Sequence, residues 1–388
     1  MRFMSDVLDA LRPNPVLDAL EGETGVSVVG GAVRDALLGR VPHELDLLVE
    51  GDATAVARRV AERMGGVATV HERFGTATVR AAGHTFDLVS ARTERYPRPG
   101  ALPEVELGAT VEQDLARRDF SVNAIAVRVS DGALIAWPGA REDLDAGVLR
   151  VLHDASFRDD PTRLLRGARY AARLGFAPEP ATDALWAAAV REEVLATVTG
   201  SRLGEELRLL TREPQPDALR ALERHGLAQA VVHPAMAVDE ALVNLARALV
   251  PPDGRADLAA FAATLRAAPR AELAQRLDRL EFPAPERDLI LAAAAAPAVA
   301  PADDAALWAA LRRLPAEAVA VAGAAGDAQT ARRWLEDVRH RRLAITGDDL
   351  VAAGLRGPAV GAALERAMVA LLRGEARDRA AQLDRALS

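Results

Sequence analysis

Residues 28–46 read Val-Val-Gly-Gly-Ala-Val-Arg-Asp-Ala-Leu-Leu-Gly-Arg-Val-Pro-His-Glu-Leu-Asp, and this stretch decides how the first part of the chain is expected to fold. It predicts an apolar strand that runs into the Gly30–Gly31 turn, then a short helix with Arg34, then a second strand that carries Glu44 and Asp46. Side chains at i and i+2 of a strand project from the same face, so these two carboxylates would repel each other unless a cation neutralises them. A divalent cation is the usual neutraliser, and a glycine turn beside an acid pair therefore indicates a magnesium–triphosphate site.

Asp87 supplies a third acid in another strand-like run, Thr-Phe-Asp-Leu-Val-Ser at residues 85–90. We expect three carboxylates on adjacent strands to hold two magnesium ions, one at an attacking hydroxyl and one at a leaving pyrophosphate. An ordinary solvated strand end is the first alternative interpretation of this acid pattern. The second alternative is a dinucleotide-binding loop. This sequence has neither the third glycine nor the ribose-binding acid that such a loop requires at the proper spacing.

The composition limits the class of protein. The chain has 388 residues and a formal net charge of −8, a length that allows roughly two to four packed units. It has no cysteine, which excludes disulfides, zinc–thiolate sites and thiol nucleophiles. It also has no lysine, and all 48 basic residues are arginine, whose planar fork suits phosphates and base edges. The net acidity argues against a generally basic RNA-coating surface, but it leaves room for a local basic groove.

Export and membrane insertion are not expected. The N-terminus carries acids and no apolar signal core, and no uncharged apolar run reaches membrane-spanning length. We therefore expect a cytoplasmic protein with no membrane partner.

The pattern of predicted secondary structure changes near Leu149. Strand-like runs alternate with short helical patterns before this residue, whereas helical periodicity dominates after it and prolines mark the helix boundaries. An α+β protein is expected, with a strand-containing head followed by a long helical part. One helix is predicted at 52–64, and five strands are predicted at 26–30, 45–49, 77–80, 85–89 and 124–129.

Residues 117–124, Arg-Arg-Asp-Phe-Ser-Val-Asn-Ala, form the next candidate site element. Two arginines that enter an apolar strand are compatible with a simple exposed edge. Their combination with Asp119 and Asn123 also allows contacts to phosphate and ribose.

A basic helix face is predicted within residues 157–170. Asp160 is expected to cap a helix whose first residue is Pro161. Arginines then recur every three residues and share one broad face, which is either a solvated surface or a template for a base and its phosphates; they are Arg163, Arg166 and Arg169.

Taken in order, these motifs resemble class II tRNA nucleotidyltransferases, the CCA-adding enzymes and their bacterial poly(A) polymerase relatives. The motif-rich part covers about residues 26–210, and the C-terminal match is looser. The matching stretches are 29–35 with 44–46, 73–77, 87–92, 117–124, 159–169, 200–207 and 345–354.

The resemblance implies a polymerase-β-like nucleotidyltransferase head at residues 1–147. It further implies a helical neck with a nucleotide-selecting helix at 148–212, and a helical body and tail at 213–388 that hold tRNA.

The resemblance also implies roles for individual residues. Metal binding and catalysis fall on Glu44, Asp46 and Asp87. Contacts to the incoming nucleotide fall on Gly31, Arg34 and Arg118. Base reading falls on Asp160 and Arg163, and support of the triphosphate and base pocket falls on Arg166 and Arg169.

The physical chemistry of the bases supports such an Asp–Arg pair. Cytosine and adenine both offer an amino donor beside a ring-nitrogen acceptor, so a carboxylate accepts from one and arginine donates to the other. Guanine and uracil present the reverse pattern, which would leave both protein groups unpaired at about 1–3 kcal/mol each.

The implied activity is template-independent addition of CMP and AMP, from CTP and ATP, to the 3′ end of tRNA, with Mg²⁺ as cofactor and release of pyrophosphate. No protein partner is evident from the sequence. The alternatives are an A-adding or CC-adding tRNA nucleotidyltransferase, a poly(A) polymerase, and a non-catalytic RNA-binding relative. The Pro- and Gly-rich loop at 95–103 argues against a CC-only enzyme, because in this family a loop there helps the pocket switch from C to A.

Two residues depart from the family pattern. The first catalytic acid, normally aspartate, is Glu44, and a shift near 1 Å can cost about 10²-fold in rate. The template motif normally begins Glu-Asp, whereas this chain has Asp159-Asp160.

Overall fold

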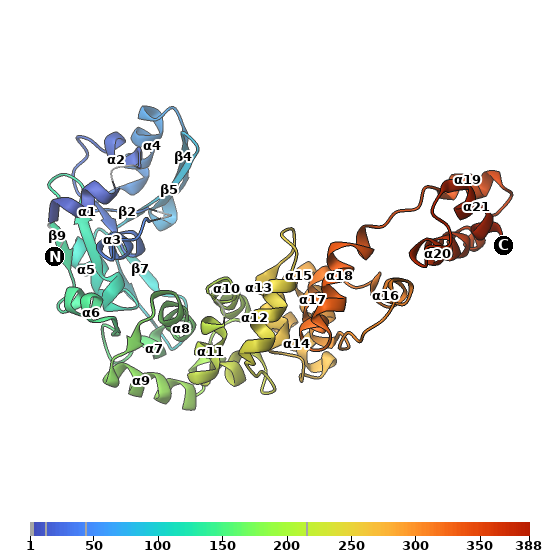
Figure 1. Cartoon of the computed structure of the whole chain (residues 1–388). Helices are drawn as coiled ribbons and strands as arrows, with labels where there is room; N and C mark the ends of the chain where they lie inside the picture. Colours follow the sequence, from blue (N-terminus) through green and yellow to red (C-terminus); the bar gives the residue numbers. More distant parts are fainter. Residues whose placement is uncertain (1–3, 12–13, 43–44, 215) are drawn as a thin grey trace. The chain divides into compact units, whose positions relative to one another are not determined.

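The computed structural model describes residues 4–11, 14–42, 45–214 and 216–388, and its contacts divide the chain into two compact units (Figure 1). The first unit comprises Met1–Glu206 with His225–Leu227, and the second comprises Leu207–Arg224 with Ala228–Ser388. The first unit holds a mixed sheet and the second holds helices, so the expected α+β class is confirmed. The finer division into head, neck, and body with tail at residues 147 and 212 stays a prediction.

A seven-stranded sheet forms the core of the first unit, in the order β3-β4-β5-β2-β1-β8-β9. Neighbouring strands are antiparallel except for β2 and β5, which run parallel. The strands are β1 (Val26–Val29), β2 (Asp46–Val49), β3 (Val67–His71), β4 (Thr76–Ala81), β5 (His84–Ser90), β8 (Ile125–Arg128) and β9 (Leu134–Ala136).

The five predicted strands are β1, β2, β4, β5 and β8, and each lies within two residues of its expected bounds. The central strand β1 is buried along its whole length, which explains its nearly continuous apolar sequence, Val-Ser-Val-Val. The strands β3 and β9 at the edges of the sheet were not predicted, because β3 is largely exposed and β9 has only three residues.

Two helices that follow strands of this sheet position the site. Helix α3 (Gly31–Leu37) begins directly after β1, with Gly30 as its N-terminal flanking residue. Helix α4 (Ala53–Arg63) packs against β3, β4 and β5 and fits the predicted helix, and Figure 1 shows it beside β4 and β5. The Asp52 carboxylate caps α4 by accepting from the backbone N–H groups of Thr54 and Ala55 at 2.8 and 3.1 Å.

The remaining elements of the first unit are short up to residue 159 and mostly helical beyond it. Strands β6 and β7 pair with each other, as do β10 and β11. Phe120, Phe157, Tyr170 and Trp186 form an aromatic cluster in which neighbouring ring centroids lie 5.5–6.4 Å apart. These elements are α1 (Met4–Leu11), α2 (Val16–Ala19), η1 (Glu72–Phe74), β6 (Arg92–Arg95), β7 (Glu104–Leu107), α5 (Val111–Ala116), η2 (Ser121–Asn123), α6 (Ala140–Ala146), β10 (Val148–Leu149), α7 (Ser156–Asp159), α8 (Thr162–Leu174), β11 (Ala177–Pro178), α9 (Pro180–Arg191), η3 (Val194–Thr197) and the start of α10 (Gly200–Thr211).

The second unit is built from amphipathic and alanine-rich helices. Its last helices pack around a small core of Ile345, Leu350, Ala363, Ala367 and Ala386. Its further elements are α11 (Asp217–Arg224), η4 (Ala228–Val232), α12 (Glu240–Leu249), α13 (Ala256–Ala263), α14 (Arg270–Arg279), α15 (Ala284–Ala295), α16 (Asp304–Leu311), α17 (Ala316–Ala324), α18 (Ala328–Glu336), η5 (Val338–His340), α19 (Gly347–Ala352), α20 (Pro358–Leu372) and α21 (Arg379–Leu387).

None of the helices in the described part of the chain has the length and apolar character needed to span a bilayer.

Candidate functional site

Two of the predicted acids lie side by side on the sheet. Asp46, the first residue of β2, pairs in register with Asp87 of the parallel strand β5, and Asp46 also lies opposite Val29 at the end of β1. Partners in register on parallel strands share a face of the sheet, and both carboxylates are exposed. The hydroxyl of Thr78 on β4 donates to Asp87 Oδ1 at 2.6 Å and holds that carboxylate in place.

Glu44, the third predicted acid, lies outside the described residues. Within the part of the chain that the structure describes, no three His, Asp or Glu side chains gather into a metal-binding group. Asp46 and Asp87 alone still offer adjacent carboxylate oxygens, the ligand type that hard divalent cations prefer. The acid pair therefore fits a divalent metal that draws its remaining ligands from elsewhere.

The Gly30 turn lies directly under an arginine. Gly30 has a φ of 67°, and a methyl group there would lie 2.8 Å from a terminal nitrogen of Arg118. The buried carboxylate of Asp114 accepts from Arg118 at 3.1 Å and fixes the guanidinium over the turn. The Nε of Arg118 is buried and has no hydrogen-bond partner among the described residues. A buried donor without a partner beside a glycine turn fits an anionic ligand such as a phosphate.

Arg34, predicted to contact the nucleotide, is only 2% exposed. Its Nε donates to Asp35 at 2.9 Å, and a terminal nitrogen donates to Asn123 Oδ1 at 2.5 Å. Asn123 in turn donates from Nδ2 to Asp119 Oδ1 at 3.0 Å. The side chain of Arg34 is thus held from both sides before any ligand arrives.

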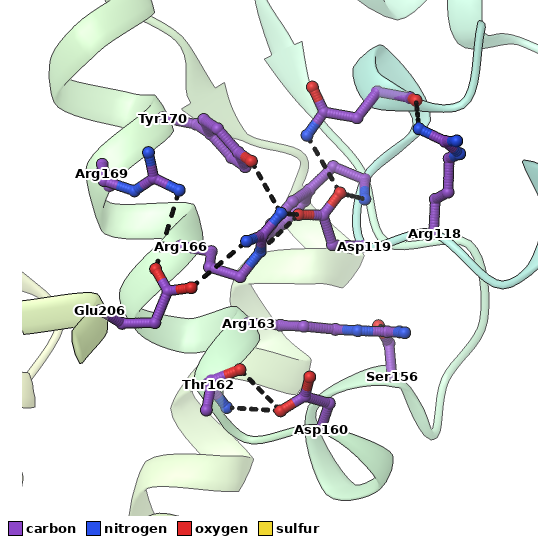
Figure 2. Close-up of polar contacts among 12 residues, drawn as sticks. Arg118, Asp119, Ser156, Asp160, Thr162, Arg163, Arg166, Arg169, Tyr170 and Glu206 are labelled. Carbon is purple, nitrogen blue, oxygen red and sulfur yellow. Dashed lines mark hydrogen bonds and ion pairs between the residues drawn. The ribbon is translucent and has the colours of Figure 1, made fainter. Parts of the chain in front are cut away.

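Asp119 links this chain of hydrogen bonds to helix α8. Its Oδ2 accepts from Nε of Arg166 at 2.8 Å and forms an ion pair with a terminal nitrogen of Arg166 at 2.7 Å, and Figure 2 shows the two side chains facing each other. Burial opposes ionisation of Asp119, but the positive charge of Arg166 and the hydrogen bond from Asn123 outweigh it and hold the pKa of that carboxyl well below its usual range. Asp119 and Asn123, for which phosphate and ribose contacts were one interpretation, are therefore engaged inside the protein.

Three guanidinium groups surround the ring of Tyr170. Those of Arg34, Arg166 and Arg169 lie 5.4, 5.7 and 5.0 Å from its centroid. The hydroxyl of Tyr170 accepts from Arg166 at 2.9 Å, as Figure 2 shows. Burial raises the pKa of the Tyr170 phenol, so it stays protonated. Three of the arginines predicted for the nucleotide pocket therefore concentrate their positive charge around this one ring.

The two predicted base-reading residues lie at the start of α8. The helix begins at Thr162, one residue after the predicted start, and Asp160 accepts from the backbone N–H of Thr162 at 3.1 Å. Arg163 is 4% exposed, and it donates to Ser156 Oγ at 2.6 Å and to the carbonyl of Arg117 at 2.8 Å. The start of α8 is therefore tied to the segment that also carries Arg118.

Helix α10 supplies two site residues that the sequence did not identify. Arg202 donates to Asp160 at 2.8 Å, and Glu206, one turn later, accepts from Arg166 at 3.2 Å. The signal that points to them is their i, i+4 spacing within the motif at 200–207, since such residues share a helix face.

The structure thus brings together most of the predicted site residues. Gly31 lies beside Arg34, since a methyl group on Gly31 would lie 3.4 Å from an Arg34 nitrogen. Only Glu44 cannot be placed, because it lies outside the described residues.

The sheet-bearing part of the chain matches a known family. Residues 26–150 match the family model described as the Poly A polymerase head domain. This range contains the sheet from β1 to β9, the Gly30 turn, both described acids and Arg118.

Two curated relatives match about half of the chain. It is 45% identical over 195 residues to the A-adding tRNA nucleotidyltransferase of Halalkalibacterium halodurans, covering 49% of this chain and 45% of that protein. It is 42% identical over 209 residues to the CC-adding tRNA nucleotidyltransferase of Deinococcus radiodurans, covering 53% of this chain and 54% of that protein. The chain therefore spans about half the length of these relatives.

A solved structure matches the chain along its whole length. It is described as the apo form II of a CCA-adding enzyme, and the match has a TM-score of 0.81 and 26% identity, covering 100% of this chain and 98% of that chain.

The sheet-bearing part is thus similar to a Poly A polymerase head domain, and the chain shares its fold with a CCA-adding enzyme. These matches support the resemblance to class II tRNA nucleotidyltransferases and bacterial poly(A) polymerases that the motifs predicted. Members of this family generally use divalent metals.

Proposed function

We propose that the protein adds CMP and AMP, from CTP and ATP, to the 3′ end of tRNA without a nucleic-acid template and releases pyrophosphate. The observation that carries this proposal is that one segment, Arg117–Arg118, joins the two halves of the site. Arg118 covers the Gly30 turn, next to which Asp46 is paired, and the carbonyl of Arg117 accepts from Arg163. The glycine turn, to which we assign the triphosphate, and Arg163, to which we assign base reading, therefore both contact the same stretch of backbone.

We assign metal binding and catalysis to Asp46 and Asp87, with Glu44 as the third ligand. A divalent metal, Mg²⁺ in this proposal, would supply positive charge to activate the tRNA 3′-hydroxyl and neutralise the triphosphate. The register of β2 and β5 presents the two carboxylates together, and Thr78 orients one of them. These residues hold the reacting groups close and aligned, which is the main protein contribution in phosphoryl-type transfers.

We assign the incoming nucleotide to the glycine turn and the arginines around it. Gly31 allows close approach of the phosphates, Arg118 has an unused buried donor, and Arg34, Arg166 and Arg169 supply positive charge around Tyr170. Because Arg34 is almost fully buried, we expect it to act mainly by holding the turn and by its charge.

We assign base selection to Asp160 and Arg163. An ionised carboxylate only accepts hydrogen bonds and a guanidinium only donates them, so the pair matches the amino group and ring nitrogen of C and A. Uracil and guanine present a carbonyl and a ring N–H at these positions and leave both side chains unsatisfied.

The relatives support more than one product. Those that match this chain include A-adding, CC-adding and CCA-adding enzymes, so A-only and CC-only addition are the first alternatives, ahead of a poly(A) polymerase and a non-catalytic RNA-binding relative. The loop at 95–103 favours a product that includes A. We further propose that the helical part beyond residue 212 binds the tRNA and that the protein acts in the cytoplasm.

A primer series tests the proposal. Three tRNAs, ending at the discriminator base, after the second C and after the full CCA, are each incubated with labelled CTP or ATP and Mg²⁺ or Mn²⁺. Full CCA synthesis on the first tRNA is expected, whereas extension of the second tRNA alone identifies an A-adding enzyme. Extension of the intact tRNA by many A residues identifies a poly(A) polymerase.

Asp46→Asn tests the metal assignment in the same assay. This variant should lose nucleotide addition and keep tRNA binding largely intact. Absence of incorporation by the unaltered protein with every tRNA and both metals would sink the catalytic proposal in favour of the RNA-binding one. Activity of Asp46→Asn within tenfold of the unaltered protein would refute the metal assignment.

A further inference from the structure

The two oxygens of the Asp160 carboxylate have different surroundings. Oδ1 accepts three hydrogen bonds: from the backbone N–H of Thr162 at 3.1 Å, from the hydroxyl of Thr162 at 2.7 Å and from Arg202 at 2.8 Å. No residue in the described ranges donates to Oδ2. One oxygen is therefore saturated by the protein, and the other remains available to a ligand.

Arg202 uses its second terminal nitrogen to hold the loop at 95–103. This nitrogen donates to the carbonyl of Gly100 at 3.0 Å. The N–H of Gly100 donates to the carbonyls of Arg158 and Asp159 at 3.2 and 3.3 Å, so the loop is docked from both sides. A side chain at Gly100 would collide with Thr197, and its φ of 69° also favours glycine.

We propose that Arg202 is a positioning residue for nucleotide selection. By occupying Oδ1, it leaves Oδ2 of Asp160 as the single acceptor for the amino group of the incoming base, and it clamps Gly100 of the loop against the same carboxylate. This inference rests on the proposed function of the site. It adds a residue from α10, outside the nucleotide-contacting set, that determines how Asp160 faces the base.

The physical reason is the freedom of an aspartate side chain. A carboxylate held only by its own helix start can still turn about its last torsion, which is broad. A guanidinium that bridges the carboxylate and a backbone carbonyl removes that freedom, because both of its contacts must break together. A displacement of about 1 Å at a reacting or reading group can cost on the order of 10²-fold.

Arg202→Ala tests the proposal directly. The ratio of kcat/KM for the accepted nucleotides to that for UTP and GTP is expected to fall by about 10-fold or more, with most of the loss in KM for the correct nucleotide. Affinity for tRNA is expected to stay unchanged. An equal fall for all four nucleotides, or an unchanged ratio, would overturn the proposal.

Arg202→Lys separates position from charge. Lysine keeps the positive charge, but its single ammonium cannot bridge Asp160 and Gly100 as the guanidinium fork does. We expect the discrimination ratio to fall for this variant too, and discrimination equal to that of the unaltered protein would show that charge alone suffices. This variant also decides the matter if the alanine variant does not fold.

The matched control is Arg158→Ala. Arg158 lies two residues before Asp160 and makes an exposed ion pair with Glu192 at 2.8 Å, but it contributes no donor to Asp160. Its removal deletes a neighbouring arginine and should leave discrimination unchanged. The same loss of discrimination in this variant would mean that any local perturbation suffices, and the specific role of Arg202 would be refuted.

Hydrogen exchange provides a readout that needs neither nucleotide nor tRNA. In Arg202→Ala, amide exchange in the loop peptide that contains Gly100 should quicken, while α9 keeps the protection it has in the unaltered protein. Unchanged loop exchange would refute the clamp. Quickened exchange in a protein that adds no nucleotide would instead confirm the clamp and place the failure on the proposed function.

Discussion

Asp119 and Arg166 meet at one carboxylate oxygen, Oδ2, which accepts a hydrogen bond from Nε at 2.8 Å and forms an ion pair with a terminal nitrogen at 2.7 Å. The other oxygen of Asp119 accepts from the N–H of Phe120 and the amide of Asn123. The pair therefore joins the segment before η2 to helix α8, and it does so inside the protein, where Asp119 is 6% exposed. The arginine-rich helix is held to the glycine-turn side of the site by this contact.

Asp119→Asn should destabilise α8. Removing one partner of a buried ion pair costs about 3–5 kcal/mol of stability. We expect the lower value of about 3 kcal/mol here, because Arg166 is partly exposed and also contacts Glu206. Hydrogen exchange of the α8 amides measures this change within the first unit. The control is Asp145→Asn, which breaks the exposed pair with Arg141 and should leave exchange unchanged.

The same pair predicts a pH dependence. The pKa of Asp119 is depressed below its ordinary value of 3.8, so the ionised form stabilises the fold fully above pH 3.8 and this contribution is lost as the pH falls toward the depressed pKa. The difference in α8 stability between the unaltered protein and Asp119→Asn should therefore shrink on acidification below pH 3.8. A difference that grows in acid would contradict the assignment.

The raised pKa values of the two tyrosines predict that they ionise at higher pH in the folded protein than in the unfolded chain. Burial, with the nearby charge of Glu94, raises the pKa of Tyr96 to about 12, and burial also raises that of Tyr170. A raised pKa means that stability from the protonated phenols is complete below the ordinary pKa of 10.0 and is lost as the pH rises through the folded value. Ultraviolet absorbance at pH 10.0 should therefore show less tyrosinate in the folded protein than in the protein unfolded in urea. In Tyr96→Phe, the rise in absorbance that belongs to Tyr96 should disappear from the titration above this pH.

The central strands and the acid pair were predictable because their signals are local. The apolar run of β1, the glycine pair and the position of Asp46 all fall within one stretch of the sequence. Asp87 lies in its own strand-like run, and the structure places it in register with Asp46. Strand alternation and turn chemistry act over a few residues, so the sequence displays them directly.

The positioning residues were less accessible for a physical reason. Arg202 is one of 48 basic residues, and its contact with Asp160 spans 42 positions along the chain. Such a contact depends on how α10 packs against the start of α8, and no local pattern encodes that packing. The burial of Arg34 has the same origin, since its hydrogen-bond partner Asn123 lies 89 positions away.

Thr78→Val should weaken metal use without removing a ligand. The hydroxyl of Thr78 orients Asp87 at 2.6 Å, and losing such an outer contact to a metal ligand typically costs about 10–100-fold in metal affinity. The metal concentration for half-maximal activity should rise by that factor, while Thr78→Ser keeps the hydroxyl and the original value. Thr76→Val on the same strand lies opposite Val89 and serves as the control. An equal effect of the Thr76 and Thr78 variants would argue against orientation of Asp87.

Gly30→Ala and Gly31→Ala should separate stability from nucleotide binding. A methyl group on Gly30 would lie 2.8 Å from Arg118, and its φ of 67° with ψ of −129° is a backbone conformation that favours glycine. This variant should lose both stability and nucleotide affinity, because Arg118 must move. A methyl group on Gly31 lies 3.4 Å from Arg34, so it should leave stability nearly unchanged and reduce affinity only through its clash with the phosphates.

Gly83→Ala is the control for backbone strain in that comparison. Gly83 has a φ of 78°, and nothing lies within 4 Å of the position that a methyl group would occupy. It should lose stability through backbone strain alone, yet bind ATP and CTP with unchanged affinity in equilibrium titrations. If Gly83→Ala also weakened nucleotide binding, the loss in Gly30→Ala would reflect general destabilisation. If Gly31→Ala bound nucleotide normally, the close approach of phosphate to this turn would be refuted.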